Sequence, residues 1–142
     1  MRFWQIVIDT NVFISALRSQ LGASYKLLML LESDKFETNI SVSLAMEYEA
    51  VSKRFLTEIR LTNREVEDIL NYVFAAANRR KVYYLWRPFL PDAKDDMVLE
   101  LAVAANCEII VTYNKKDFRG AEKFGIKTMT PQEFLREIGE IK

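Results

Sequence analysis

Short apolar runs of strand length alternate along this chain with segments of helical periodicity. Residues 4–8, 36–43, 81–86, 108–112 and 126–130 form the apolar runs, and amphipathic segments lie between them. Strands that alternate with helices in this way are typical of a parallel sheet with helices on both faces. We therefore predict an α/β fold, a three-layer α/β/α sandwich around a central, mainly parallel sheet.

Local signals predict where several helices begin. Two pairs have the spacing of a capping box, in which each residue bonds the backbone of the other. These pairs are Thr62 with Glu65 and Thr130 with Glu133. Ser43 is expected to cap a helix over residues 43–55, and the charged run 79–81 is expected to be a solvated junction before a strand.

The length and composition favour one compact domain over residues 1–142. Half of the residues are hydrophobic, which suffices for a single core. The chain has no histidine, which excludes the serine-histidine-aspartate triad, the cysteine-histidine pair and nearly every zinc site. Any hydrolytic chemistry must then come from carboxylates, lysines, hydroxyls or a hard metal ion.

Cysteine content and hydropathy favour a reducing, cytoplasmic location. Cys107 is the single cysteine, so no disulfide framework is possible, and it is interpreted as a small buried hydrophobe. No apolar stretch approaches the roughly 18 residues that span a bilayer, so no membrane association is expected. Twenty basic residues balance twenty acidic ones, so nucleic-acid binding would depend on a local patch.

Polar residues follow several of the predicted strands. Asp9 comes directly after the first strand, and Thr112 and Asn114 follow the fourth. Ligands of open parallel sheets bind at the carboxyl ends of the strands. The loop and helix segments after the second and third strands add further acids to the same edge, namely Glu47, Asp92, Asp95 and Asp96.

Each of these acids also has a purely structural interpretation. Asp9 could cap the next helix, and Asp95 or Asp96 could do the same farther along the chain. Glu47 could belong to a solvated helix face, but its position between Leu44 and Val51 favours an inward orientation. Together the acids permit binding of Mg²⁺, which takes oxygen ligands and assists phosphodiester hydrolysis without histidine.

Three segments of the chain resemble the signature regions of PIN domains, in the branch of VapC-like toxins. The segments are VIDTNVFISAL, SVSLAMEYEAVSKRF and PDAKDDMVLELAVAANCEIIVTYNKKDF. The resemblance implies a ribonuclease dependent on Mg²⁺ or Mn²⁺, often a homodimer. In toxin–antitoxin pairs of this family, a small antitoxin protein occupies the active-site groove.

The resemblance also implies site residues by position. Asp9 matches the first acidic ligand, with Thr10 and Asn11 as the companions that orient it. Glu47 matches the second, while its neighbour Glu49 is expected to face water. Asp95 fits the third position best, with Asp92 as the first acid of that region and Asp96 as the rival metal ligand.

The third region ends in residues with supporting roles. Thr112 is expected to orient the carboxylates, and Asn114 stands where many family members have a fourth acid. Asp117 fits a supporting or helix-capping role. Lys115, Lys116 and Arg119 are the candidates for binding RNA, although a solvated loop explains the same charges.

We thus predict a metal-dependent endoribonuclease, the toxin of a toxin–antitoxin pair, with Asp9, Glu47 and Asp95 as catalytic residues. The alternative is a PIN-like module that binds RNA or protein without cleaving anything. A phosphoaspartyl receiver or phosphatase is disfavoured, because the acidic pair that such a site needs near its first strand is missing.

Overall fold

In the computed structural model, residues 3–82 and 89–142 are described. Their centre is a parallel sheet of five strands in the order β3-β2-β1-β4-β5. In chain order the strands are β1 (Trp4–Ile8), β2 (Phe36–Ile40), β3 (Asn78–Arg79), β4 (Ile109–Val111) and β5 (Lys127–Met129). The predicted parallel α/β architecture is confirmed.

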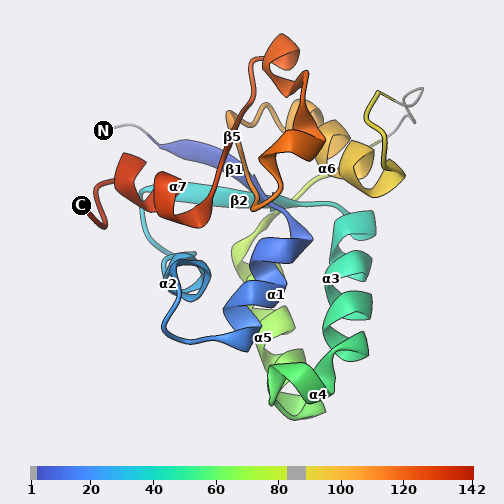
Figure 1. The fold of residues 1–142 in the computed structure, drawn as a ribbon, viewed down its shortest axis with the longest axis vertical. Helices are drawn as coiled ribbons and strands as arrows, with labels where there is room; N and C mark the ends of the chain where they lie inside the picture. Colours follow the sequence, from blue (N-terminus) through green and yellow to red (C-terminus); the bar gives the residue numbers. More distant parts are fainter. Residues whose placement is uncertain (1–2, 83–88) are drawn as a thin grey trace.

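Helices connect the strands and cover the sheet. They are α1 (Thr10–Arg18), α2 (Ala23–Met29), α3 (Val42–Arg54), α4 (Leu56–Ile59), α5 (Asn63–Ala76), α6 (Ala93–Ala104) and α7 (Pro131–Glu137), with 3₁₀ turns η1 (Lys115–Phe118) and η2 (Ala121–Phe124). In Figure 1, α1, α4 and α5 lie on one side of β1 and β2, and α6 lies on the other. None of the described helices has the length and hydropathy of a bilayer-spanning segment.

The core lies where β1 meets its neighbours. Ile6 pairs with Ile109 and Ile8 pairs with Val111 across the two central strands, and all four side chains are buried. Both faces of these strands are covered by helices, which explains why their sequences are continuously apolar rather than alternating.

Tyr48 ties α3 to the end of β1. Its ring stacks on Phe13 of α1 with ring centroids 4.6 Å apart, and its hydroxyl donates a hydrogen bond to the carbonyl oxygen of Ile8. Burial raises the pKa of the Tyr48 hydroxyl, which therefore stays protonated and serves as a donor. This contact fixes α3 beside the strand that ends at the candidate site.

Both predicted capping boxes are confirmed. The hydroxyl of Thr62 accepts from the backbone N–H of Glu65 at 3.1 Å, and the Glu65 carboxylate accepts from the N–H of Thr62 at 3.0 Å. Thr130 and Glu133 make the same two contacts ahead of α7. These caps depend only on residues three positions apart, which is why the sequence alone identifies them.

The predicted cap at Ser43 is wrong. The hydroxyl of Ser41 accepts from the N–H of Leu44 at 3.1 Å, so α3 begins two residues earlier and Ser43 lies exposed in its first turn. Both serines have a suitable side chain. Ser41 is used because β2 already ends at Ile40.

The third strand also differs from its prediction. β3 consists of Asn78 and Arg79, which pair with the end of β2, while Lys81 and Val82 lie in no strand. β2 ends at Ile40, whose carbonyl accepts from the N–H of Arg80 at 2.8 Å, so pairing stops there. The rest of the predicted strand 81–86, including the aromatic residues Tyr83, Tyr84 and Trp86, lies outside the described residues.

The charged run 79–81 is more than a solvated junction. Nε of Arg80 donates to the side-chain oxygen of Asn39 at 2.8 Å. The amide of Asn39 in turn lies 3.4 Å from Sγ of Cys107 and 3.0 Å from the side-chain oxygen of Gln5. Cys107 is buried, and burial raises the pKa of its thiol to about 12, in keeping with its interpretation as a small buried residue.

Candidate active site

Asp9 lies at the junction of β1 and α1. Its N–H donates to the carbonyl oxygen of Val111 at 2.9 Å, which continues the sheet pairing by one residue. Its side chain accepts from the N–H of Thr10 at 2.8 Å and so caps α1. The capping interpretation of Asp9 is therefore correct, and it leaves the other carboxylate oxygen for further contacts.

Asp9 is held by residues from two strand ends. Its Oδ2 accepts a hydrogen bond of 2.8 Å from the hydroxyl of Thr112 and one of 3.3 Å from the amide of Asn11. Asn11 also accepts from the N–H of Tyr113 at 3.2 Å. Both oxygens of the carboxylate are thus oriented by neighbours, and Oδ1, which accepts a single hydrogen bond, retains a lone pair for another ligand.

The pKa of Asp9 is raised, because the residue is only 8% exposed and burial disfavours the charged form of its carboxylate. The hydrogen bonds from Thr112 and Thr10 oppose this shift, while the charges of Asp117 and Glu47 add to it. A bound cation would stabilise the ionised form of a buried carboxylate that has other carboxylates nearby.

Glu47 approaches the same place from α3. Its side chain is only 13% exposed, and its Oε1 lies 3.7 Å from Nζ of Lys94. Leu44 is buried and Val51 is partly buried on the same helix face, so Glu47 faces inward as its spacing predicts. Glu49 is exposed.

The start of α6 supplies three acids with different surroundings. Asp92 caps the helix by accepting from the N–H of Lys94 at 2.8 Å. Asp96 is buried, and its Oδ1 accepts from the N–H groups of Phe89 and Leu90 at 3.3 and 2.9 Å. Asp96 thus binds the preceding loop, and Asp95 remains beside Asp9.

The pKa of Asp95 is raised to about 6. Partial burial contributes most, followed by the charge of Asp9 and then those of Asp92, Asp117 and Asp96. A negative charge that raises the pKa of another acid lies close enough to repel it. Asp95 and Asp9 therefore come together although 85 residues separate them in the sequence.

A cleft of about 380 Å³ joins these side chains. Its lining includes most of the residues expected at the site, namely Asp9, Thr10, Asn11, Glu47, Asp92, Asp95 and Asn114. Asp96 and Thr112 do not line it, because Asp96 faces the loop and Thr112 lies fully buried behind Asp9.

Sequence reasoning underrated two residues in the cleft. Asp117, expected only to support or cap, lines the cleft and raises the pKa of both Asp9 and Asp95. Lys94, which had no assigned role, lines it too and pairs with Glu47. The positions of these residues in the sequence could have indicated that they lie in the cleft. Asp117 follows Asn114 by three residues, and Lys94 directly precedes Asp95.

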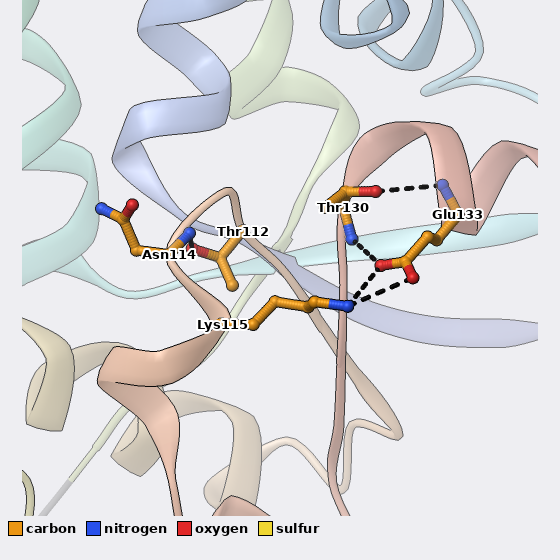
Figure 2. A network of polar contacts seen from close by, with 5 residues as sticks. All are labelled: Thr112, Asn114, Lys115, Thr130 and Glu133. Carbon is orange, nitrogen blue, oxygen red and sulfur yellow. Dashed lines mark hydrogen bonds and ion pairs between the residues drawn. The ribbon is translucent and has the colours of Figure 1, made fainter.

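The basic residues expected to bind RNA lie outside the cleft lining. Nζ of Lys115 donates to both carboxylate oxygens of Glu133, at 2.9 and 3.1 Å. Figure 2 shows Lys115 extending toward Glu133 and Thr130, while Asn114 extends the other way. Lys116 and Arg119 are exposed, and among the described residues neither of them forms an ion pair, unlike Lys115.

The described acidic side chains are not arranged so that several of them could coordinate one metal ion directly. Within residues 3–82 and 89–142, no group of three or more histidine, cysteine or acidic side chains is close enough to hold one metal ion. The donor chemistry still suits Mg²⁺, which often binds one or two carboxylates and retains several waters.

Comparison with known families assigns the chain. A family model described as PIN domain matches residues 5–116, which is most of the sequence and includes α3, α6 and all of β1 except Trp4. The chain belongs to the PIN domain family. The matched part of this PIN domain contains Asp9, Glu47, Asp95 and Asn114 and ends just before Asp117.

A solved structure shares the fold of this PIN domain. It is the VapBC2 complex from Rickettsia felis bound to a DNA fragment from its promoter, with a TM-score of 0.60 and 14% sequence identity. The likeness covers 87% of this chain and 98% of the other. A search of curated proteins found no match.

Proposed function

We propose that this PIN domain is an endoribonuclease that depends on Mg²⁺ or Mn²⁺ and acts as the toxin of a toxin–antitoxin pair. The observation that carries the proposal is the convergence of acids from three separate segments, Asp9, Glu47 and Asp95, on one cleft, where the charge of Asp9 helps to raise the pKa of Asp95. PIN domains are generally nucleases that use divalent metal ions.

Asp9, Glu47 and Asp95 would hold the ion together, one or two of them directly and the remainder through water. Their repulsion costs free energy that a divalent cation relieves. Asp96 is the weaker candidate, because it does not line the cleft and its Oδ1 instead accepts the N–H groups of Phe89 and Leu90. When bound, such an ion activates water and stabilises the charge that develops on the phosphate oxygens.

The surrounding residues keep the carboxylates in place. Thr10, Asn11 and Thr112 fix the carboxylate of Asp9 in one orientation, and such supporting bonds affect metal affinity strongly. Lys94 holds Glu47 toward the cleft and offsets its charge. Asn114 lines the cleft as a neutral group that can bond water or a phosphate oxygen.

Exposed cations near the cleft would bind the RNA backbone. Lys116 and Arg119 are exposed on the segment that follows β4, directly after the cleft residue Asn114. Lys115 must first leave Glu133 to join them. Because the chain has no net charge, RNA binding would depend on these local charges and on salt concentration.

We also propose a cytoplasmic location, a homodimeric assembly and an antitoxin that covers the cleft. The VapBC2 structure is of a toxin–antitoxin complex, which supports the antitoxin as a partner. A second gene product that copurifies with this chain and blocks its nuclease activity would establish that role. A nuclease without such a partner would keep the enzymatic proposal and remove the toxin role.

RNA cleavage by wild type and by the Asp9→Asn variant tests the enzymatic proposal. We expect cleavage by wild type with Mn²⁺ or Mg²⁺, none with EDTA, and none by Asp9→Asn. Equal cleavage by both proteins would remove the metal hypothesis. No cleavage by wild type, with RNA still bound, would favour the alternative of a binding module.

A further inference from the structure

The cleft that contains the carboxylates continues past them along the groove between α1 and α3. Its lining residues on these helices recur every fourth position, with Thr10, Ile14 and Arg18 on α1 and Glu47, Val51 and Phe55 on α3 and at its end. Residues four positions apart share one face of a helix. Figure 1 shows the two helices side by side, both leading away from the sheet. The cleft therefore has a second end, away from the strand ends.

The second end lies about 12 Å from the acids, because eight positions separate Glu47 from Phe55 and a helix rises about 1.5 Å per residue. The stretch between the two ends is apolar. Ile14 is buried and Val51 is partly buried, and Met97 of α6 lines the same cleft. This stretch suits a flat, weakly hydrated group rather than a phosphate.

Two contacts hold Arg18 at the second end of the cleft. The carbon of its guanidinium lies over the ring of Phe55, 5.5 Å from the ring centroid, which is close enough for a cation–π attraction. Its Nη2 donates a hydrogen bond of 3.0 Å to Oε2 of Glu58. The side chain of Arg18 is nevertheless 47% exposed. Arg18 thus presents a guanidinium that is fixed in position and still accessible.

A structural role accounts for the charge of Arg18 but not for its planar group. Arg18 stands in the last turn of α1, where any cation interacts favourably with the helix dipole, and a lysine could also pair with Glu58. A guanidinium differs from an ammonium because it is flat, weakly hydrated and able to stack. A substitution that keeps the charge and removes the plane therefore separates the two roles.

We propose that Arg18 is a platform on which a nucleobase of single-stranded RNA stacks, while the acids at the other end of the cleft hold a nearby phosphate. Unpaired bases of RNA stack on aromatic rings or on the plane of an arginine guanidinium. The ring of Phe55 supports the guanidinium from behind, and Ile14 and Val51 contact the edge of the base. This inference rests on the proposed function, since the base belongs to the RNA substrate.

A base fits this end of the cleft better than a peptide side chain does. An apolar side chain would bury the guanidinium without giving it a hydrogen bond, which costs free energy. An acidic side chain would compete with Glu58, which already accepts from Arg18. A base covers the guanidinium with its π face and leaves the bond to Glu58 intact.

The affinities of two RNA oligomers test the platform, one an oligouridine and the other of the same length but without bases. Fluorescence anisotropy in the presence of EDTA gives both dissociation constants without cleavage. We expect wild type to bind the oligouridine at least about tenfold more tightly, because a stacked base contributes that much. Arg18→Lys should remove most of this difference. Its affinity for the oligomer without bases should stay within about twofold of wild type, because the positive charge remains.

Arg64→Lys is the matched control. Arg64 also lies near an acid, Asp68, at 3.9 Å, but its side chain is 86% exposed and does not line the cleft. This variant should keep the wild-type preference for bases. Uridine, which has a base but no phosphate, gives a second readout. It should shift the NMR signal of the Arg18 Nε–H and leave that of Arg64 unchanged.

The outcomes distinguish the platform from the nuclease activity. An equal preference for bases in wild type and Arg18→Lys would overturn the platform, and so would the absence of binding by both oligomers and by uridine. If Arg18→Lys weakened the binding of a copurifying antitoxin and not that of RNA, Arg18 would belong to a protein interface instead. A wild type that prefers bases through Arg18 but cleaves no RNA would support the platform and overturn the nuclease proposal. Cleavage without that preference would do the reverse.

Discussion

The hydroxyl of Thr112 donates a hydrogen bond of 2.8 Å to Oδ2 of Asp9, although 103 positions separate the two residues. Thr112 follows β4 and Asp9 follows β1, and these strands are neighbours in the sheet. The bond between the two strand ends therefore fixes the first acid of the candidate site.

We expect Thr112→Val to weaken this site without unfolding the protein. Valine has the shape of threonine but no hydroxyl, so Asp9 loses a buried hydrogen bond and the pKa of its carboxylate rises further. The loss should cost about 1–3 kcal/mol of stability and about 10–100-fold in Mg²⁺ affinity. Urea unfolding measures the loss of stability, and calorimetric titration measures the loss of Mg²⁺ affinity. Thr112→Ser, which keeps the hydroxyl, should stay near wild type.

Asp9→Asn should abolish nuclease activity and keep the fold. Asparagine caps helices about as well as aspartate, so the contact with the N–H of Thr10 can persist, but the negative charge is lost. We expect RNA cleavage to fall at least about 100-fold with a similar circular dichroism spectrum. Glu49→Gln, on the exposed face of α3, serves as the control for loss of an acid.

Asp95→Asn should stabilise the protein in the absence of divalent metal. The folded-state pKa of Asp95 is about 6, above its ordinary value of 3.8, so the folded protein binds the proton more tightly than the unfolded chain does. Stability from this group is present at low pH and is lost as the pH rises from about 4 to 6. At pH 7 the variant should melt about 2–4 °C higher, for a gain of roughly 1 kcal/mol at this partly exposed site.

The pH dependence of the melting temperature tests whether Asp95→Asn stabilises the protein as expected. The difference between Asp95→Asn and wild type should vanish near pH 3, where the wild-type carboxyl is protonated in both states. Added Mg²⁺ should raise the melting temperature of wild type more than that of the variant. Asp34→Asn, at an exposed position, should show neither effect. A variant less stable than wild type at pH 7 would contradict the raised pKa.

Asp96→Ala should destabilise the protein, whereas Asp95→Asn should stabilise it. Its Oδ1 accepts from the N–H groups of Phe89 and Leu90, and Leu90 is buried. Removing the acceptor should cost about 1–3 kcal/mol, measured by urea unfolding, with little change in Mg²⁺ affinity per folded molecule. A large drop in that affinity with unchanged stability would make Asp96 the metal ligand instead.

Lys116→Ala and Arg119→Ala should weaken RNA binding mainly through the phosphate backbone. Each removed contact should reduce the slope of log affinity against log salt concentration by about 0.7 for single-stranded RNA. Fluorescence anisotropy at several salt concentrations gives that slope. Lys115→Ala should change it less, because Glu133 already holds Lys115. Equal slopes for all variants would place RNA elsewhere on the protein.

The sequence by itself determined the features that depend on neighbouring residues. The capping boxes at Thr62 and Thr130 involve residues three positions apart, and the alternation of apolar runs with helical periodicity reflects local geometry. The parallel direction of the strands and the location of Asp9 at a strand end follow from that alternation, whereas the order of the strands in the sheet comes from the structure.

Only the tertiary structure decided which side chains meet. Asp95 and Asp96 are adjacent and chemically identical. Asp96 accepts a hydrogen bond from the backbone of Leu90 in the preceding loop, whereas Asp95 lies beside Asp9. Lys115 is likewise drawn to Glu133 by the position of α7. These outcomes depend on burial and on contacts between segments that are distant in the sequence, so local sequence patterns do not reveal them.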